Sequence, residues 1–187
     1  MFELRVLFVG PTIKRAVCCS ADRNQISRRD GWPIEDVEKL YLSHSEEETI
    51  RIARHLVAEL EGGTTILLFG ELGAGKTAFV RGLVEGAGGN PDDVSSPTFT
   101  LLQPYEGRLT VHHVDLYRVT PFEVDELGLD ELATPLAIVA IEWADRLPRA
   151  PVRSIAIHID DQGADKRQIR IDTSESDIEV LGPAVPQ

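Results

Sequence analysis

An eight-residue stretch from Gly70 to Thr77 (GELGAGKT) combines residue types and spacing that suit the binding of a phosphate group. Its glycines let the backbone curl so that successive N–H groups face inward and bind the oxygens of an anion. Lys76 adds a point charge for the outer phosphates of a nucleotide, and the hydroxyl of Thr77 suits Mg²⁺. A short apolar run, 65–69, precedes the stretch, and a helical pattern, 76–85, follows it. This context predicts a nucleotide phosphate site rather than a glycine-rich turn without a ligand.

Two acidic residues, Asp115 and Glu142, each come directly after a run that is predicted to be a strand. Carboxyl ends of parallel strands meet at the edge of the sheet where a phosphate loop also lies. Either carboxylate suits Mg²⁺ or the orientation of an attacking water, and the sequence leaves that choice open. His112 and His113 lie just before Asp115, and strand alternation turns one of them inward. For that histidine, a packed or hydrogen-bonded core position is expected rather than a ligand.

The elements that must position these residues alternate between helices and strands. Ser45 and Glu48 form a capping-box pattern, so a helix is expected from there until Gly62-Gly63 ends it. The continuous apolar run 65–69 is typical of a strand buried on both faces of a parallel sheet. Further strands are expected at 98–102, 109–114, 137–141, 155–159 and 169–171.

The order of these elements predicts an α/β fold with a mostly parallel central sheet flanked by helices. The last two strands are close in sequence, which predicts a C-terminal antiparallel hairpin. Acidic helical segments are expected between Pro121 and Leu132. With the phosphate loop, the arrangement is P-loop NTPase-like.

Composition excludes several classes of protein. The chain has 187 residues, with 19 Lys and Arg against 31 Asp and Glu, and its net charge of −12 disfavours a basic nucleic-acid binder or a polybasic membrane-surface protein. The only two cysteines, Cys18 and Cys19, are adjacent, which excludes a disulfide scaffold. No apolar run reaches the roughly 18 residues of a membrane span, and residues 1–10 lack the basic start of a signal peptide. We expect a cytoplasmic protein.

The charge is unevenly distributed along the chain. Residues 1–31 hold six basic and three acidic side chains, so they carry +3 and leave −15 for the remaining residues. We therefore predict a poorly ordered N-terminal extension (1–38), a P-loop domain (39–173) and a C-terminal tail (174–187). A basic arm that contacts RNA or a partner is the alternative interpretation of the extension.

Four stretches together resemble the bacterial TsaE family, the P-loop ATPases of tRNA threonylcarbamoyladenosine (t6A) biosynthesis. They are Gly70–Thr77 (GELGAGKT), Ser96–Phe99 (SPTF), His113–Arg118 (HVDLYR) and Glu142-Trp143 (EW). The phosphate loop alone is shared by many families, whereas this combination and spacing are specific. The resemblance runs from about Leu42 to Thr173 and does not extend to residues 1–38.

The resemblance implies a role for each matching position. Catalytic roles fall on Lys76, Asp115 and Glu142, and the magnesium ligands are Thr77 and Glu142. A switch-like segment falls on Ser96, Pro97 and Thr98, with Thr98 near the γ-phosphate. The implied ATP-binding residues are Glu46, Glu71, Leu72, Gly73, Ala74, Gly75, Lys76, Thr77, Ala78 and Trp143.

Some of these assignments have competing interpretations. Helix capping explains Glu46 equally well, and a packed core position is the alternative for Trp143. Tyr117 and Arg118 are implied to position the active-site loop or to contact a partner. Arg118 is also the nearest candidate to stabilise transition-state charge, unless a partner supplies that arginine.

The resemblance also implies a function. Such a protein is a Mg²⁺-dependent ATPase required for t6A at adenosine 37 of tRNAs that read codons beginning with A. It acts with the TsaD–TsaB complex, hydrolyses ATP weakly alone, and meets tRNA only through that complex. We expect a monomer. The acidic segment Glu123–Glu131 is a first guess for a surface that meets a basic partner, with a solvated helix face as the alternative.

Three other functions are compatible with a phosphate loop. A metabolite or nucleotide kinase normally has an arginine-bearing lid, but only Arg81 and Arg108 lie between the phosphate loop and Asp115. A guanine-selective GTPase normally has an Asn/Thr-Lys-x-Asp motif, which is absent. The sequence does not distinguish a non-enzymatic, nucleotide-gated assembly factor from an ATPase, so this choice needs an experiment.

Overall fold

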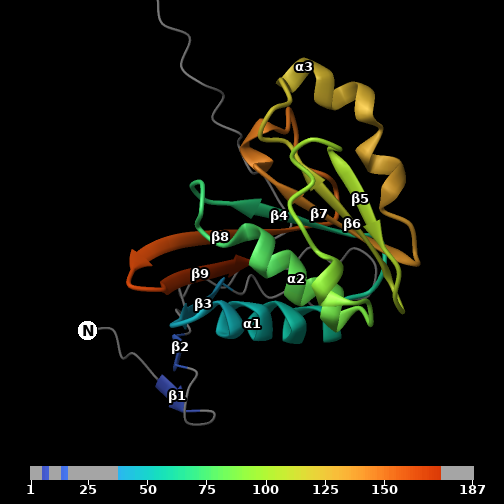
Figure 1. Ribbon diagram of the computed structural model, residues 1–187. Helices are drawn as coiled ribbons and strands as arrows, with labels where there is room; N and C mark the ends of the chain where they lie inside the picture. Colours follow the sequence, from blue (N-terminus) through green and yellow to red (C-terminus); the bar gives the residue numbers. More distant parts are fainter. Residues whose placement is uncertain (1–5, 9–13, 17–37, 174–187) are drawn as a thin grey trace, which may run out of the picture.

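A mixed β-sheet positions the predicted site, and the computed structural model describes it over residues 6–8, 14–16 and 38–173 (Figure 1). The strands are β1 (Val6–Phe8), β2 (Lys14–Ala16), β3 (Glu38–Ser43), β4 (Thr64–Phe69), β5 (Leu102–Tyr105), β6 (Thr110–Asp115), β7 (Ala137–Glu142), β8 (Ser154–Gly163) and β9 (Lys166–Asp172). The α-helices are α1 (Glu46–Ala58), α2 (Lys76–Gly86) and α3 (Pro121–Val124). Four 3₁₀ turns are η1 (Pro91–Asp93), η2 (Asp125–Leu127), η3 (Leu129–Leu132) and η4 (Ala144–Arg146). Most of the predicted extension 1–38 and all of the predicted tail 174–187 lie outside the described residues.

The sheet has the strand order β1-β2-β3-β9-β8-β4-β7-β6-β5. Its four central strands, β8, β4, β7 and β6, run parallel to one another, as expected for strands joined by helical crossovers. The flanking strands β9, β3 and β5 are antiparallel, so the sheet is mixed. The parallel centre and the antiparallel β8–β9 pair match the prediction, whereas the antiparallel β3 and β5 were not predicted. Short turns join β5 to β6 and β8 to β9 and leave no room for a crossover, so these two pairs are antiparallel.

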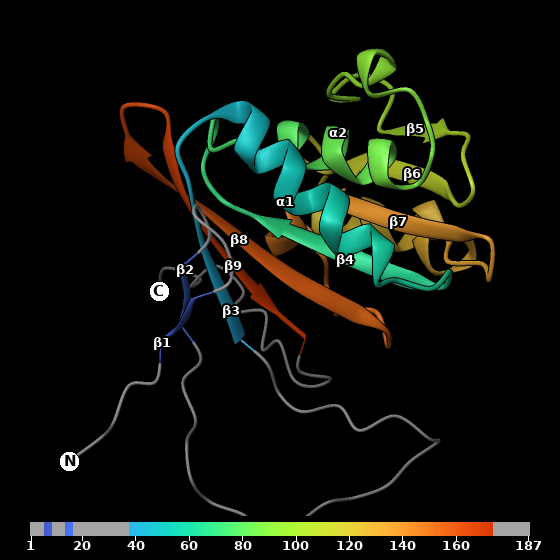
Figure 2. The same cartoon turned by 90° about the horizontal axis from the view of Figure 1, so that it is seen from below.

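Two layers of helix cover the two faces of the sheet. Helices α1 and α2 lie side by side on one face, and the segment from α3 to η3 lies on the other (Figures 1 and 2). One hydrophobic core packs α1 and α2 onto the sheet through residues such as Phe79 and Leu83. A second core, around Val124, Val139 and Ile141, holds the α3 segment. Because both faces are covered, β4 and β7 are buried along almost their whole length, as in other parallel sheets.

Helix α1 begins where the capping pattern predicts. The Ser45 side chain accepts a hydrogen bond from the Glu48 backbone N–H at 3.2 Å. The Glu48 carboxylate accepts from the His44 backbone N–H at 2.8 Å, one residue earlier than in a standard capping box. The helix ends at Ala58, before the Gly62-Gly63 pair predicted to stop it, because the last turn tightens to three-residue hydrogen bonds.

Between residues 38 and 173, two strands differ from the sequence-based prediction. The strand expected at 98–102 starts only at Leu102, because Thr98 is tied to Asp115 and Leu101 adopts a left-handed backbone (φ 65°). Strand β3 was not predicted, and it forms by antiparallel pairing with β9 along its whole length. The predicted terminal hairpin is confirmed as β8–β9, closed by Ala164 and Asp165 in left-handed conformations.

No helix within the described residues is long and apolar enough to cross a membrane.

Candidate functional site

The phosphate loop connects β4 to α2, which is the strand–loop–helix context that the sequence predicts. Gly70 is required by close approach, because a Cβ there would lie 2.4 Å from the carbonyl oxygen of Ile159 on β8. Gly75 immediately precedes α2 with φ 109°, a left-handed conformation that favours glycine. The Arg167 side chain on β9 donates from Nε to the Ala74 carbonyl at 2.9 Å and braces the loop from the hairpin. The loop therefore lies against β8 and is hydrogen-bonded to β9.

Lys76 is buried at the centre of this loop, with 4% of its surface exposed. Its Nζ donates to the carbonyls of Gly70 at 2.6 Å and Glu71 at 2.9 Å. The ammonium lies 3.8 Å from the ring centroid of Trp143, a cation–π contact. Burial lowers the pKa of Lys76, and the negative charge of Glu142, with smaller contributions from other carboxylates, opposes that shift. A bound anion would relieve the unfavourable burial of this charge.

Glu142, at the end of β7, accepts two hydrogen bonds on one oxygen. The Thr77 hydroxyl lies 2.8 Å from Oε1, and His113 Nε2 lies 2.8 Å from the same atom. Glu142 is 3% exposed and His113 is fully buried. The expectation of a hydrogen-bonded core position for one of the two histidines therefore holds for His113.

Asp115, at the end of β6, holds the segment that contains the SPTF sequence. Its Oδ2 accepts from the hydroxyls of Ser96 and Thr98, each at 2.7 Å. Its Oδ1 accepts from the backbone N–H of Tyr117 at 2.9 Å. Pro97 is buried between the two hydroxyl residues. The two bonds to Oδ2 place the predicted switch segment against the end of β6.

Trp143 follows Glu142 directly and turns the chain out of the sheet. Its backbone is left-handed, with φ 60°, and its ring meets that of Tyr117 at a centroid distance of 4.9 Å. With Lys76 against the same indole, the ring contacts both the phosphate loop and the segment after β6. A strained backbone of this kind, held by neighbours, is common at functional sites.

A cavity of about 450 Å³ collects most of the predicted residues at the carboxyl edge of the parallel strands. Its predicted lining residues are Glu46, Leu72, Gly73, Gly75, Lys76, Thr77, Ala78, Ser96, Thr98, Asp115, Glu142 and Trp143. Tyr117 also lines it, together with Arg81, which the sequence analysis did not assign to the site. The predicted Glu71, Ala74 and Pro97 do not line it, although Glu71 contacts Lys76 through its carbonyl.

One side of the cavity mouth is formed by two helices. The Glu46 carboxylate at the start of α1 pairs with Arg81 on α2. Arg81 also donates to the Val94 carbonyl at 3.4 Å, in the segment before Ser96. Glu46 therefore lines the cavity and forms an ion pair, which helix capping alone does not explain. The position of Arg81, one helical turn after Thr77 on the predicted helix, is the sequence feature that could have identified it as a site residue.

Arg118 does not line the cavity. Its guanidinium lies 4.4 Å from the ring centroid of Phe99, whose side chain is 84% exposed. This contact places Arg118 on the outer surface of the SPTF segment. The predicted role of Arg118 in transition-state charge stabilisation is not supported by a position in the cavity.

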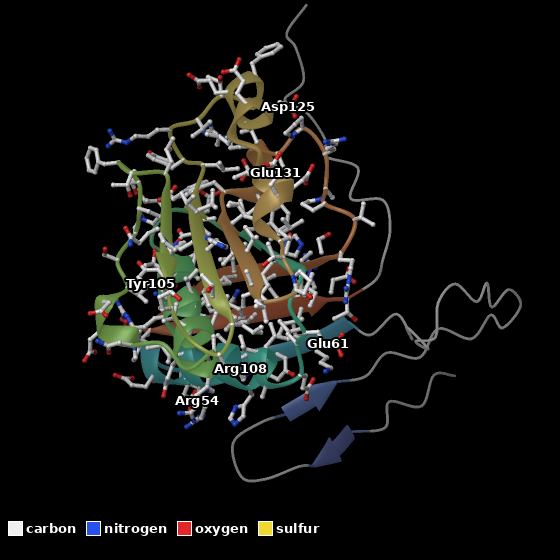
Figure 3. All side chains as sticks on the ribbon, turned by 90° about the vertical axis from the view of Figure 1, so that its right-hand side faces the viewer. Arg54, Glu61, Tyr105, Arg108, Asp125 and Glu131 are labelled. Atoms are coloured by element: carbon white, nitrogen blue, oxygen red, sulfur yellow. The ribbon has the colours of Figure 1, made fainter. Side chains whose placement is uncertain are left out.

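A larger hollow of about 610 Å³ lies at the opposite end of the strands. Glu61 and Arg108 mark this end, away from Asp125 and Glu131 on the segment after α3 (Figure 3). It is lined by turns before and after strands and by Arg108, Arg153 and Glu61, with no phosphate loop or strand-end carboxylate. Chemistry rather than volume therefore identifies the smaller cavity as the candidate site.

The donor set at Thr77 and Glu142 fits a magnesium ion that also binds phosphate. A hydroxyl and a carboxylate 2.8 Å apart are the hard oxygen ligands that Mg²⁺ prefers, and it takes few protein ligands when substrate phosphates supply others. Within the described ranges, no group of three or more His, Cys, Asp or Glu side chains is arranged to hold a metal ion alone. A magnesium ion here would accordingly depend on a nucleotide.

Comparison with known proteins gives matches over the same part of the chain. A family model described as "Threonylcarbamoyl adenosine biosynthesis protein TsaE" matches residues 43–169. A Nostoc protein named "tRNA threonylcarbamoyladenosine biosynthesis protein TsaE" is 38% identical over 147 residues, covering 75% of this chain and 90% of its own. The Bacillus subtilis protein of that name is 39% identical over 125 residues, covering 66% and 78%.

One solved structure agrees with the fold as well as the sequence. The crystal structure of Bacillus subtilis YdiB superposes with a TM-score of 0.57 at 31% sequence identity. The match covers 73% of this chain and 85% of that one. The segment matched by the family model contains the phosphate loop, the SPTF segment and both strand-end carboxylates.

Proposed function

The chain belongs to the TsaE family, and from that premise we propose that it is a Mg²⁺-dependent ATPase required for t6A at adenosine 37 of tRNAs that read codons beginning with A. Relatives from Nostoc and Bacillus subtilis are named for t6A biosynthesis, which supports a role in that tRNA modification. We place this activity in the cytoplasm.

One observation carries the ATPase proposal. The Lys76 ammonium, the Thr77 hydroxyl and the Glu142 carboxylate line a single cavity together with the glycine-rich loop. These are the groups that a nucleotide phosphate and its cation need: a point charge, a cation ligand from the loop and an acid from a neighbouring strand.

Lys76 binds the outer phosphates in this proposal. Its Nζ now donates to the carbonyls of Gly70 and Glu71, which are neutral acceptors. A phosphate oxygen is a charged acceptor and forms a stronger hydrogen bond to an ammonium group. Thr77 and Glu142 would hold Mg²⁺, which would supply neutralisation of charge on the β- and γ-phosphates.

Hydrolysis then consists of in-line attack by a water oxygen on the γ-phosphorus. The bond between that phosphorus and the bridging oxygen of ADP breaks, and the proton of the water leaves with phosphate or to solvent. Because both oxygens of Asp115 already accept hydrogen bonds, we assign it the placement of Ser96 and Thr98. Thr98 is then the residue that meets the γ-phosphate.

We further propose that the TsaD–TsaB pair is the partner and stimulates hydrolysis. The segment from Glu123 to Glu131 carries exposed acidic side chains, and Phe122 beside it is 90% exposed. A basic surface with an apolar recess on the partner would complement both features. We propose that TsaD–TsaB, and not this chain, contacts the tRNA directly, because residues 32–187 carry a net charge of −15 that repels phosphates.

The test is Mg²⁺-dependent ATP hydrolysis by the full chain, with and without purified TsaB–TsaD. We expect feeble hydrolysis alone and stimulation by the pair, with both abolished in Lys76→Ala. Lys39→Ala is the matched control, since Lys39 pairs with Glu59 away from the cavity.

An absence of stimulation would overturn the partner proposal. Equal hydrolysis by wild type and Lys76→Ala would overturn the ATPase proposal. If the Glu142→Ala variant still binds ATP and supports t6A formation in cells, hydrolysis is dispensable. The protein is then a nucleotide-gated assembly factor rather than an ATPase.

A further inference from the structure

We propose that His113 is a positioning residue that fixes the Glu142 carboxylate toward the cation and water side of the cavity. This inference rests on the proposed function for its role in ATP hydrolysis. Its structural basis is independent of that function, because the contact between the two side chains is present in the chain itself.

The tautomer of His113 follows from its partner. A carboxylate accepts hydrogen bonds and cannot donate them, so the Nε2 atom 2.8 Å from Glu142 Oε1 must carry the hydrogen. Nδ1 is buried and has no hydrogen-bond partner among the described residues. An unpartnered lone pair is less costly there than an unpartnered N–H, which also favours hydrogen on Nε2.

Strand register brings the imidazole beneath the carboxylate. Asp115 lies opposite Glu142 in the parallel pair of β6 and β7, and His113 is two residues earlier on the same face as Asp115. This is the face covered by α1 and α2, where Val111 and Ala140 join the core. The ring of Tyr105 packs at 6.3 Å between centroids, so His113 is enclosed on the core side and directed at Glu142.

The contact selects one orientation of the Glu142 carboxylate. The terminal torsion of a glutamate is broad, so a carboxylate without fixed donors can turn its plane about that torsion. Here His113 and Thr77 both donate to Oε1, and no donor among the described residues contacts Oε2. Oε2 is therefore the oxygen left for a cation or its water.

His113 is also the deeper of the two donors. Thr77 belongs to the phosphate loop and is the residue assigned to the cation, whereas His113 is fully buried and makes no other hydrogen bond within the described residues. Such supporting hydrogen bonds typically change metal affinity or activity about 10–100-fold when removed. We expect the same range for this contact.

Substitutions at His113 separate a positioning role from packing. The amide nitrogen of glutamine reaches about where Nε2 lies, whereas that of asparagine reaches only to Nδ1. His113→Gln should keep hydrolysis and the Mg²⁺ requirement within about threefold of wild type. His113→Phe and His113→Asn should lower kcat and raise the Mg²⁺ concentration for half-maximal ADP binding, each about 10–100-fold.

A control residue lies one position away. His112→Phe changes the same residue type on the opposite face of β6, and we expect it to leave both quantities unchanged. Thermal unfolding of every variant identifies any that fail to fold. If His113→Gln and His113→Phe lose activity equally while folded, or if His113→Phe equals wild type, the proposal is wrong.

A measurement without nucleotide tests the contact directly. The ¹⁵N resonances of the His113 ring should show the Nε2–H tautomer in wild type, and in Glu142→Leu the Nε2–H should lose the shift caused by its hydrogen bond, whereas the His112 ring should not change. An Nδ1–H tautomer in wild type would overturn the inference. In addition, His113→Phe should have no further effect on Mg²⁺-dependent ADP binding when Glu142 is already glutamine.

The two proposals fail separately. If wild type binds Mg²⁺ and ADP but hydrolyses no ATP with or without TsaB–TsaD, the ATPase proposal fails, while ring spectra and binding still decide the role of His113. If wild type hydrolyses ATP and His113→Phe has the same Mg²⁺ requirement, only the inference about His113 fails.

Discussion

Two carboxylates at the ends of adjacent strands have nearly the same environment and quite different partners. Asp115 and Glu142 lie opposite each other in the register of β6 and β7, and they are 2% and 3% exposed. Asp115 accepts hydrogen bonds from two hydroxyls of the SPTF segment and from the backbone N–H of Tyr117. Glu142 accepts from the first turn of α2 and from the core of β6.

The contrast associates each acid with a different part of the site. Asp115 holds residues that contact one another on an irregular segment, where Ser96 and Thr98 also lie 2.7 Å apart. Glu142 holds groups on regular elements that the two cores keep in place. Strand position alone did not distinguish the two acids, whereas their hydrogen-bond donors support the proposal that Asp115 anchors the loop and Glu142 binds the cation.

Of the changes at the two acids, Glu142→Gln has the largest expected effect. Loss of the charge at the cation side should lower kcat for ATP hydrolysis about 10²–10³-fold, the range seen when a single group that stabilises developing charge is removed. Nucleotide affinity should change much less, because Lys76 and the loop amides remain. Single-turnover hydrolysis alongside equilibrium binding checks both quantities, and a loss of binding equal to the loss of rate would contradict the assignment.

Asp115→Asn should have the next largest effect, of a different kind. Hydrogen bonds to a charged acceptor contribute about 1.5–3 kcal/mol each, so weakening those from Ser96 and Thr98 should release the segment and lower kcat about 10–100-fold. Hydrogen exchange of the amides at 96–101 should accelerate in Asp115→Asn. In Glu142→Gln the same amides should exchange as in wild type, and acceleration in both variants would remove the distinction between the two acids.

Single hydroxyl deletions in the segment should have smaller effects. Ser96→Ala and Thr98→Val each remove one donor to Asp115, which we expect to lower kcat about three- to tenfold. Ser95→Ala is the matched control, since it removes a neighbouring exposed hydroxyl that makes no hydrogen bond to Asp115. In the Asp115→Asn background both deletions should have little further effect, and full additivity would show that the hydroxyls act elsewhere.

The smallest expected effect concerns the pKa of Lys76. Burial lowers this pKa, and the negative charges of Glu142 and then Asp115 oppose the shift. Removing a nearby negative charge disfavours the ammonium form, so the pKa should fall in both neutral variants and fall further in Glu142→Gln. Titration of the Lys76 side chain by NMR measures it; a larger fall in Asp115→Asn would contradict the arrangement.

Local sequence patterns predicted the elements whose start or burial depends on residues close together in the chain. Ser45 capping, the buried β4 run and the start of α2 at Lys76 all match the structure. The sequence missed β3 and placed the β5 strand too early, because both depend on partners far along the chain. Strand β3 pairs with β9 more than a hundred residues later, and the start of β5 depends on the contact of Thr98 with Asp115.

For the site, residue type and spacing were enough to select the phosphate loop and the two strand-end acids, because each belongs to a short contiguous motif. Tertiary structure alone assigned their partners. His113 reaches Glu142 from a neighbouring strand, Arg167 reaches Ala74 from the hairpin, and Arg81 pairs with Glu46 across two helices. The physical reason is that hydrogen bonds and ion pairs act over a few ångströms in space. Only the packed sheet brings residues that are distant in sequence within that reach.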